Sequence, residues 1–177
     1  MASTATKHTP LKLDQKALER AKKSLEDGAV VDKAPWRADI IRLLNDSLAT
    51  ELVCILRYRR HHFTATGLSS PAIANEFLVH ANEEQAHADR LATRIVQLGG
   101  EPDFNPETLT KRSHADYNDE LDLKAMIRSN LIAERVAIEA YSQVIELIGD
   151  KDPTTRRLIE SILEQEQEHA DELSDWL

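Results

Sequence analysis

Apolar residues recur every three or four positions along four long stretches of this sequence, at about 35–65, 71–98, 120–148 and 153–177. This spacing places them on one face of an α-helix. The runs between the stretches contain glycine and proline, which end helices and form turns. The pattern predicts an all-α protein built on four long helices.

The longest break in this pattern spans residues 101–119, which contain Pro102, Pro106 and many polar residues. We expect this segment to have no regular structure. It is long enough to run the full height of a helical bundle, as the crossover of one class of four-helix bundle does. The sequence therefore predicts a bundle over 35–177, with a long crossover between its second and third helices, preceded by an N-terminal extension over 1–34.

Within the N-terminal extension, Asp14 is expected to cap a short helix that ends at about Glu26, before Asp27 and Gly28. Residues 1–12 lack periodicity and are predicted to form a tail. Several lysines make this part of the chain basic. A solvated helix face is the favoured interpretation, and an arm that contacts DNA or a partner is the alternative.

Each of the four apolar rows is interrupted by a glutamate at a position that should face the core. These glutamates, and the two histidines that follow two of them, are Glu51, Glu84, Glu134, Glu166, His87 and His169. Segments 84–91 and 166–173 are identical at six of eight positions, and in each a Glu precedes a His by three residues. Residues at this separation lie on one face of a helix, one turn apart. Each segment can therefore direct two ligands at one point.

The spacing of the glutamates indicates a repeated module. Glu51 lies 33 residues before Glu84, and Glu134 lies 32 residues before Glu166. The midpoint of each interval falls in a turn-forming run, so each module is predicted to be a helical hairpin whose two glutamates lie at the same height. A tyrosine follows the first glutamate of each module by seven residues, at Tyr58 and at Tyr141.

Four glutamates and two histidines in a helical core require a cation. Burying one unpaired carboxylate costs several kcal/mol, and four together would repel one another. The apolar rows contain no lysine or arginine at that height. Four carboxylates and two imidazoles suit two divalent metal ions, each with one terminal Glu, one His and a share of two bridging carboxylates. A single Glu-x-x-His would be an ordinary exposed pair, but two matched copies on apolar rows favour the metal site.

Composition narrows the partners and the compartment. Acidic residues outnumber basic ones by 31 to 22. The formal charge of −9 argues against a general nucleic-acid binder and favours metal ions as partners.

The cysteine content bears on the compartment. Cys54 is the only cysteine, so an internal disulfide is excluded and the chain suits a reducing cytosol. Cys54 itself is expected to be a small buried apolar residue. Residues 1–10 lack the apolar core of a signal peptide, and no apolar run is long enough to span a membrane. We expect a soluble, cytoplasmic protein.

One basic cluster lies beyond the ligand level of the first helix, at Arg57, Arg59, Arg60 and His61. We expect it to form a solvated or subunit-contacting face.

On these motifs, the sequence resembles the ferritin-like di-iron superfamily over residues 36–177, and within it is nearest to bacterioferritin. The resemblance implies ferroxidase activity, in which O2 or H2O2 oxidises two bound Fe(II) ions and Fe(III) passes into a mineral inside a hollow homo-oligomer. The implied ligands are Glu51 and His87 for one iron, Glu134 and His169 for the other, and Glu84 and Glu166 as bridges, with Tyr58 beside them.

Two departures from the bacterioferritin pattern change what the resemblance implies. Bacterioferritins bind haem through a Met directly after the bridging Glu of the second helix, where this chain has Gln85, and its only methionines are Met1 and Met126. We therefore do not predict haem. The chain also ends at Leu177 without the fifth helix of the 24-subunit cages, which favours twelve subunits, as in the Dps-like mini-ferritins, over 24.

Other functions stay open at this point. The paired site could reduce peroxide, as in rubrerythrin-like proteins, or act as a dimanganese catalase, in both cases without mineral storage. The chain could instead be a DNA-protecting or structural bundle. Manganese or zinc could replace iron, because Glu and His bind all three metals. The sequence does not distinguish O2 from H2O2 as the oxidant.

Overall fold

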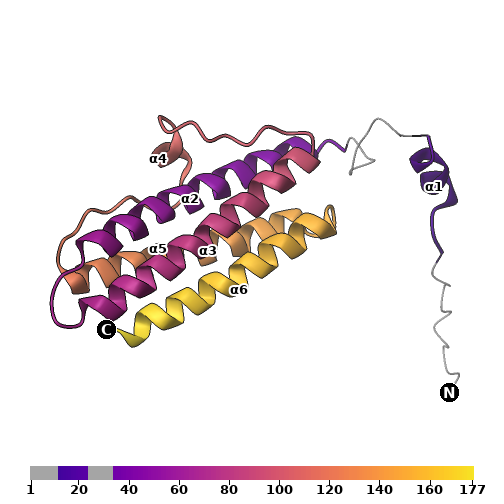
Figure 1. Ribbon diagram of the computed structural model, residues 1–177. Helices are drawn as coiled ribbons and strands as arrows, with labels where there is room; N and C mark the ends of the chain where they lie inside the picture. Colours follow the sequence, from indigo (N-terminus) through magenta and orange to yellow (C-terminus); the bar gives the residue numbers. More distant parts are fainter. Residues whose placement is uncertain (1–11, 24–33) are drawn as a thin grey trace, which may run out of the picture. The chain divides into compact units, whose positions relative to one another are not determined.

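The computed structural model describes residues 12–23 and 34–177 of the 177-residue chain (Figure 1). The chain divides into two compact units, 1–33 and 34–177. The described residues form helices and no strands, which confirms the all-α prediction. The helices are α1 (Gln15–Ala21), α2 (Arg37–Thr64), α3 (Ser70–Gln97), α4 (Leu109–Arg112), α5 (Leu123–Ile148) and α6 (Pro153–Asp175).

In the N-terminal unit, α1 begins where the sequence predicts. The Asp14 side chain accepts hydrogen bonds from the backbone N–H groups of Lys16 and Ala17, at 2.9 and 3.2 Å, and so caps the helix. The helix ends at Ala21, and Lys22 and Lys23 form a turn, so α1 is shorter than the predicted helix that runs to about Glu26. Most of the predicted tail lies outside the described residues.

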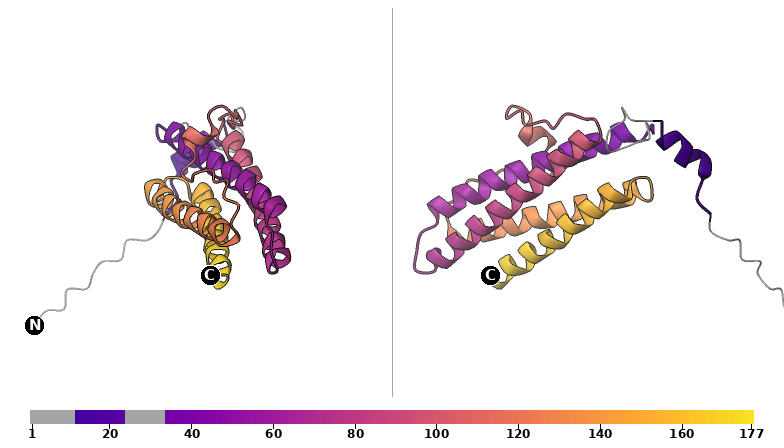
Figure 2. Two further views of the ribbon diagram at one scale, coloured as in Figure 1. Left: turned by 90° about the vertical axis from the view of Figure 1, so that its left-hand side faces the viewer. Right: turned by 45° about the vertical axis from the view of Figure 1, so that its right-hand side comes forward.

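The second unit is a bundle of two helical hairpins. Helix α2 packs against α3 and α5, and α6 packs against α5 and α3. Both views in Figure 2 show the α2–α3 hairpin lying beside the α5–α6 hairpin. Gly149 ends α5 with a φ of 51°, a conformation that glycine adopts without strain, and its N–H bonds to the Ile145 carbonyl. The four long helices lie within three residues of their predicted bounds.

The crossover between α3 and α5 is more ordered than we predicted. It runs along the bundle and contains the short helix α4, which packs against α2 (Figure 1). Leu109 of α4 is buried against Ala49 and Val53 of α2. The Arg112 side chain donates to the Asn45 carbonyl at 2.8 Å, which holds the crossover on α2. The expectation of a segment without regular structure is therefore wrong.

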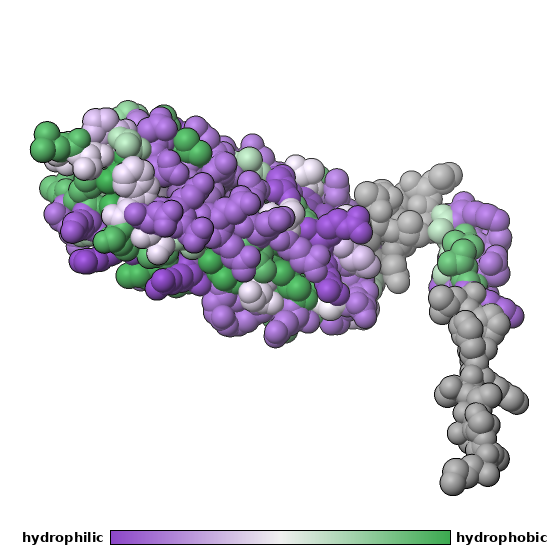
Figure 3. Space-filling model, turned by 90° about the horizontal axis from the view of Figure 1, so that it is seen from below, coloured by the Kyte–Doolittle hydropathy of each residue, from purple (hydrophilic) through white to green (hydrophobic). Residues whose placement is uncertain are grey.

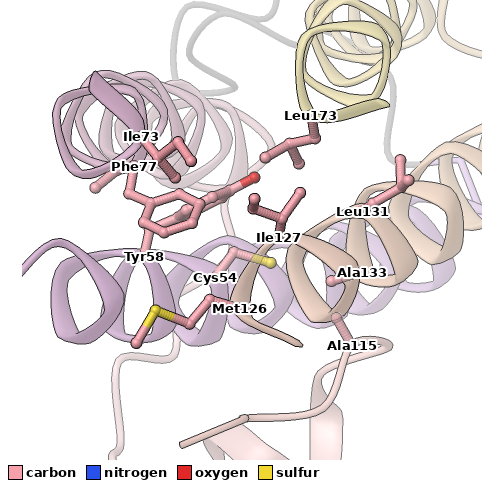
Figure 4. Close-up of a cluster of buried hydrophobic side chains, with 11 residues drawn as sticks. Cys54, Tyr58, Ile73, Phe77, Ala115, Met126, Ile127, Leu131, Ala133 and Leu173 are labelled. Carbon is pink, nitrogen blue, oxygen red and sulfur yellow. The ribbon is translucent and has the colours of Figure 1, made fainter. Parts of the chain in front are cut away.

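The predicted apolar rows form the core of the bundle. Side chains from three of the long helices, among them Tyr58, Phe77 and Leu131, meet in the cluster drawn in Figure 4, and Leu173 of α6 completes it. Cys54 belongs to the same cluster and is 2% exposed, as predicted for a small buried residue. The buried apolar positions of α6 end with Leu173, and Trp176 is exposed because it follows the last residue of the helix, Asp175.

The basic cluster on α2 is divided between core and surface. Arg59 is exposed, but Arg57 and His61 are buried, which contradicts the predicted solvated face. The Arg57 side chain donates to Asn130 Oδ1 at 2.7 Å and to the Asp116 carbonyl at 2.9 Å. It therefore joins α2 to α5 and to the crossover.

We predict that Arg57→Ala lowers the free energy of unfolding by about 3 kcal/mol, because it leaves buried acceptors unsatisfied and removes packed atoms. Urea unfolding at matched metal content measures the change. Arg59→Ala is the control and should change stability by less than ~0.5 kcal/mol, since surface substitutions usually do. Equal losses in the two variants would contradict this structural role.

Candidate metal centre

The six predicted ligands come from all four long helices and meet inside the bundle. Each of them is at most 2% exposed. Helix α2 carries Glu51, α3 carries Glu84 and His87, α5 carries Glu134, and α6 carries Glu166 and His169.

Three carboxylates surround the Nδ1 atom of His87. It lies 3.4 Å from Glu51 Oε2, 3.3 Å from Glu84 Oε2 and 3.2 Å from Glu166 Oε1. One ligand atom from each of these four residues lies within 4.8 Å of the others, close enough to hold one metal ion.

A second set surrounds the Nδ1 atom of His169. It lies 3.8 Å from Glu134 Oε2, 3.9 Å from Glu84 Oε1 and 3.4 Å from Glu166 Oε2. Glu84 and Glu166 therefore belong to both sets, and each turns one carboxylate oxygen toward each histidine. Two sets of four ligands that share two carboxylates are the arrangement a pair of metal ions needs.

The outer nitrogens of the histidines fix how the rings face the centre. His87 Nε2 lies 3.0 Å from Gln165 Oε1, and His169 Nε2 lies 3.0 Å from Glu83 Oε2. Both partners are acceptors, so both Nε2 atoms carry hydrogen. A neutral ring then turns the lone pair of Nδ1 toward the carboxylates, as metal-binding histidines do.

The inner atoms of the centre lack hydrogen-bond partners among the described residues. The unsatisfied atoms include Glu51 Oε2, Glu84 Oε1, Glu134 Oε2, both oxygens of Glu166 and His169 Nδ1. Buried polar atoms without partners are costly. The lone pairs of these nitrogen and oxygen atoms face one another in the core, which is the arrangement that binds divalent cations.

The carboxyl groups are electrostatically frustrated without metal. Burial raises the pKa of Glu51 and of Glu134 well above the ordinary value, and repulsion from Glu84 and Glu166 raises both further. Burial lowers the pKa of His169, but the nearby carboxylates of Glu134 and Glu166 outweigh it and raise this pKa to about 12. Protons therefore remain in the centre near neutral pH when metal is removed.

Each of the two tyrosines, Tyr58 and Tyr141, forms a hydrogen bond with a glutamate of the other hairpin. Tyr58, on α2, donates its hydroxyl hydrogen to Glu134 of the other hairpin. Tyr141, on α5, donates to Glu51 in the same way. Each tyrosine orients the first glutamate of the other module, a relation that the spacing within one module does not reveal.

Three residues that lie around the centre were not among the predicted site residues: Gln165, Glu83 and His80. A signal for the first two exists, because each lies four residues before the histidine of its own module and contacts the histidine of the other. The ring of His80 stacks on that of His169, with 4.2 Å between ring centroids.

Comparison with known proteins places the chain. A family model described as a ferritin-like domain matches residues 41–177. The bacterioferritin of Desulfovibrio desulfuricans (strain ATCC 27774 / DSM 6949 / MB) is 32% identical over 134 residues, which cover 75% of this chain and 71% of that protein.

Two solved structures are also similar. The bacterioferritin-related protein from Bacteroides fragilis, a dodecameric thioferritin, has a TM-score of 0.76 and 25% identity, with 92% of each chain covered. The X-ray structure of the Desulfovibrio desulfuricans bacterioferritin, described with its diiron site in different catalytic states, has a TM-score of 0.70 and 29% identity, with 78% of each chain covered.

Proposed function

This chain belongs to the ferritin-like family, and on that premise we propose that it is a ferroxidase that binds two Fe(II) ions inside its bundle. The observation that carries the proposal is the pair of four-residue sets that share Glu84 and Glu166. Two Fe(II) ions bound together supply the two electrons that reduce O2 to the level of peroxide, or H2O2 to water, as both become Fe(III).

In this proposal the position of each residue determines which of the two ions it binds. Glu51 and His87 hold one ion, and Glu134 and His169 hold the other. The two shared glutamates fix the distance between the ions, about 3.5–4 Å in two-metal sites. Tyr58 and its counterpart on α5 hold the unshared carboxylates in place by hydrogen bonds. The chain positions the ions, and the burial of every proposed ligand keeps bulk water away from them.

An anaerobic Fe(II) titration of metal-free protein tests the proposal. We expect tight binding of two Fe(II) ions per chain, followed by oxidation when O2 or H2O2 is admitted, and the faster reaction identifies the oxidant. One ion per chain, or no faster oxidation than in buffer, would contradict the proposal. Turnover of peroxide without retention of Fe(III) would instead favour the rubrerythrin-like alternative.

Storage of Fe(III) also requires an enclosed volume, which a single bundle does not provide. The related Bacteroides fragilis protein is dodecameric, and we propose a closed shell of twelve copies here. Apolar side chains stand among the hydrophilic residues of the surface (Figure 3). Among the large apolar side chains of the described residues, Phe63 and Leu68 are the most exposed, and both lie near the α2–α3 turn, where subunit contacts would bury them.

We predict a particle of about twelve chains in light scattering. If light scattering shows a particle of 24 chains, the proposed number of subunits is wrong but the proposed storage function is retained. A monomer or dimer at every iron loading would remove storage and leave only the oxidation chemistry.

No helix in the described part of the chain combines the length and apolarity needed to cross a membrane. We propose the cytoplasm as the location, because the single cysteine is buried and suits a reducing compartment. The expectation that haem is not bound stays a prediction. Gln85, in the position of the usual haem-binding Met, is exposed on α3.

A further inference from the structure

A cluster of possible ligands lies outside the paired centre, between α3 and α6. His80 Nε2 lies 2.8 Å from Glu172 Oε2 and 3.6 Å from Glu76 Oε1. The His80 side chain is fully buried, whereas the side chains of Glu76 and Glu172 are 26% and 53% exposed. One ligand atom from each residue lies within 4.8 Å of the other two. The cluster therefore combines a buried imidazole with two carboxylates that reach solvent.

The hydrogen bonds of His80 determine what it offers to this cluster. Tyr58 donates its only hydroxyl hydrogen to Glu134, so its oxygen is left as an acceptor. His80 Nδ1 lies 3.2 Å from that oxygen and must be the donor. A neutral His80 ring then turns the lone pair of Nε2 toward the carboxylates of Glu76 and Glu172. In the metal-free protein a proton on Nε2 satisfies the 2.8 Å contact with Glu172. A divalent cation that displaces this proton would gain the lone pair of Nε2 and both carboxylates as ligands.

The surroundings of the carboxylates also favour a cation. Burial raises the pKa of Glu76, and repulsion from Glu172 raises it further. Both residues line a surface pocket of about 350 Å³, together with Asp175 and Trp176. An ion from solvent can enter this pocket and meet the two carboxylates before it reaches the imidazole.

The internal repeat provides a comparison within the same chain. A shift of 82 residues superposes Glu84 on Glu166 and His87 on His169. The same shift pairs Glu76 with Leu158 and His80 with Ile162, and it pairs Glu172 with Arg90. The other half of the bundle thus has two apolar residues and an arginine at these three positions. Because an isoleucine packs at the equivalent of His80, the fold itself does not require a histidine there.

We infer that Glu76, His80 and Glu172 form a third divalent-cation site, through which metal ions enter the paired centre. One imidazole and two carboxylates suit Fe(II), Mn(II), Co(II) and Zn(II). The site lies directly beside the paired centre, because the His80 ring stacks on His169. The third site itself stands on these contacts alone, and only its role in entry rests on the proposed function.

Binding of Co(II) to the metal-free full-length protein tests the site. The test variant is Glu76→Gln with Glu172→Gln, which keeps His80 and the packing of the core. The matched control is Glu164→Gln with Glu168→Gln, which makes the same charge change at two exposed positions of α6. Equilibrium dialysis counts the bound ions, and the visible absorption of Co(II) follows their binding over time.

We expect the test variant to bind one Co(II) fewer per chain than the wild type and the control do. We also expect Co(II) to fill its paired centre more slowly. Equal numbers of bound ions in all three proteins would overturn the third site. Loss of one ion with unchanged filling of the pair would keep the site and overturn its role in entry. Failure of the pair to bind in every protein, with the difference of one ion preserved, would instead overturn the proposed function.

Discussion

Replacement of either shared glutamate, as Glu84→Ala or as Glu166→Ala, is expected to abolish the binding of two Fe(II) ions and reduce Fe(II) oxidation to its rate in buffer. Each of these side chains contacts both histidines, so its loss removes one ligand from both four-residue sets. Helix content should stay high, because the substitution also removes a buried charge that metal-free protein must accommodate.

Glu168→Ala is the matched control for this prediction. It makes the same chemical change two residues from Glu166, at an exposed position of α6. Stopped-flow oxidation and anaerobic titration should leave this control indistinguishable from the wild type. Rapid oxidation in Glu84→Ala or Glu166→Ala would show that the shared carboxylates do not hold the reacting ions.

Chelation is expected to lower the melting temperature strongly at pH 8 and weakly at pH 5. Each tightly bound ion would stabilise the folded state by mass action, by about 3 kcal/mol at a hundredfold excess over its Kd, so that two ions would raise the melting temperature by roughly 15 °C for a domain of this size. Calorimetry of loaded and metal-free protein at both pH values measures the difference.

The direction of the pH effect follows from the pKa shifts of the centre. The folded-state pKa values of Glu51 and Glu134 are raised, so these groups bind protons in the folded protein that the unfolded chain has released. The stability they contribute is fully present below the ordinary glutamate pKa and is lost as pH rises through their folded-state values.

The histidines act in the same direction. The pKa of His169 is raised to about 12, so its contribution is fully present below the ordinary histidine pKa and lost as pH rises toward about 12. Metal-free protein should therefore be more stable at pH 5 than at pH 8. Loaded protein should instead lose its ions on acidification, because protons compete for the same ligands. A melting temperature indifferent to chelator at pH 8 would contradict a metal site at this place.

The sequence predicted the long helices well, and it predicted which residues meet in the candidate metal centre, because both depend on short-range repetition. Glu84 and His87 share a helix face by their spacing alone, and the turn near Gly149 is marked by its residue types. The short helix α4 was not predicted because Leu109 is its only buried apolar side chain, in an otherwise polar segment, and a hydrogen bond from Arg112 to a backbone carbonyl of α2 supplies a further contact.

The buried place of Arg57 could not be predicted from its neighbours in the chain. Its partners, Asp116 and Asn130, lie 59 and 73 residues away in the sequence. A run of basic residues ordinarily indicates a solvated surface, and only the packing of α5 and the crossover against α2 changes that. The contact between Tyr58 and Glu134 escaped for the same reason, because it depends on how two distant hairpins dock.

The sharing of ligands between hairpins has a consequence for the order of folding. Each hairpin supplies only part of each four-residue set, since Glu166 must join Glu51, Glu84 and His87 before the first set is complete. Local contacts form each hairpin early, whereas docking must first close the long crossover, at an entropic cost that grows with its length. Under the proposed function a metal ion would find its complete set of ligands only after docking. The supply of iron should therefore slow unfolding and leave the formation of either hairpin unchanged.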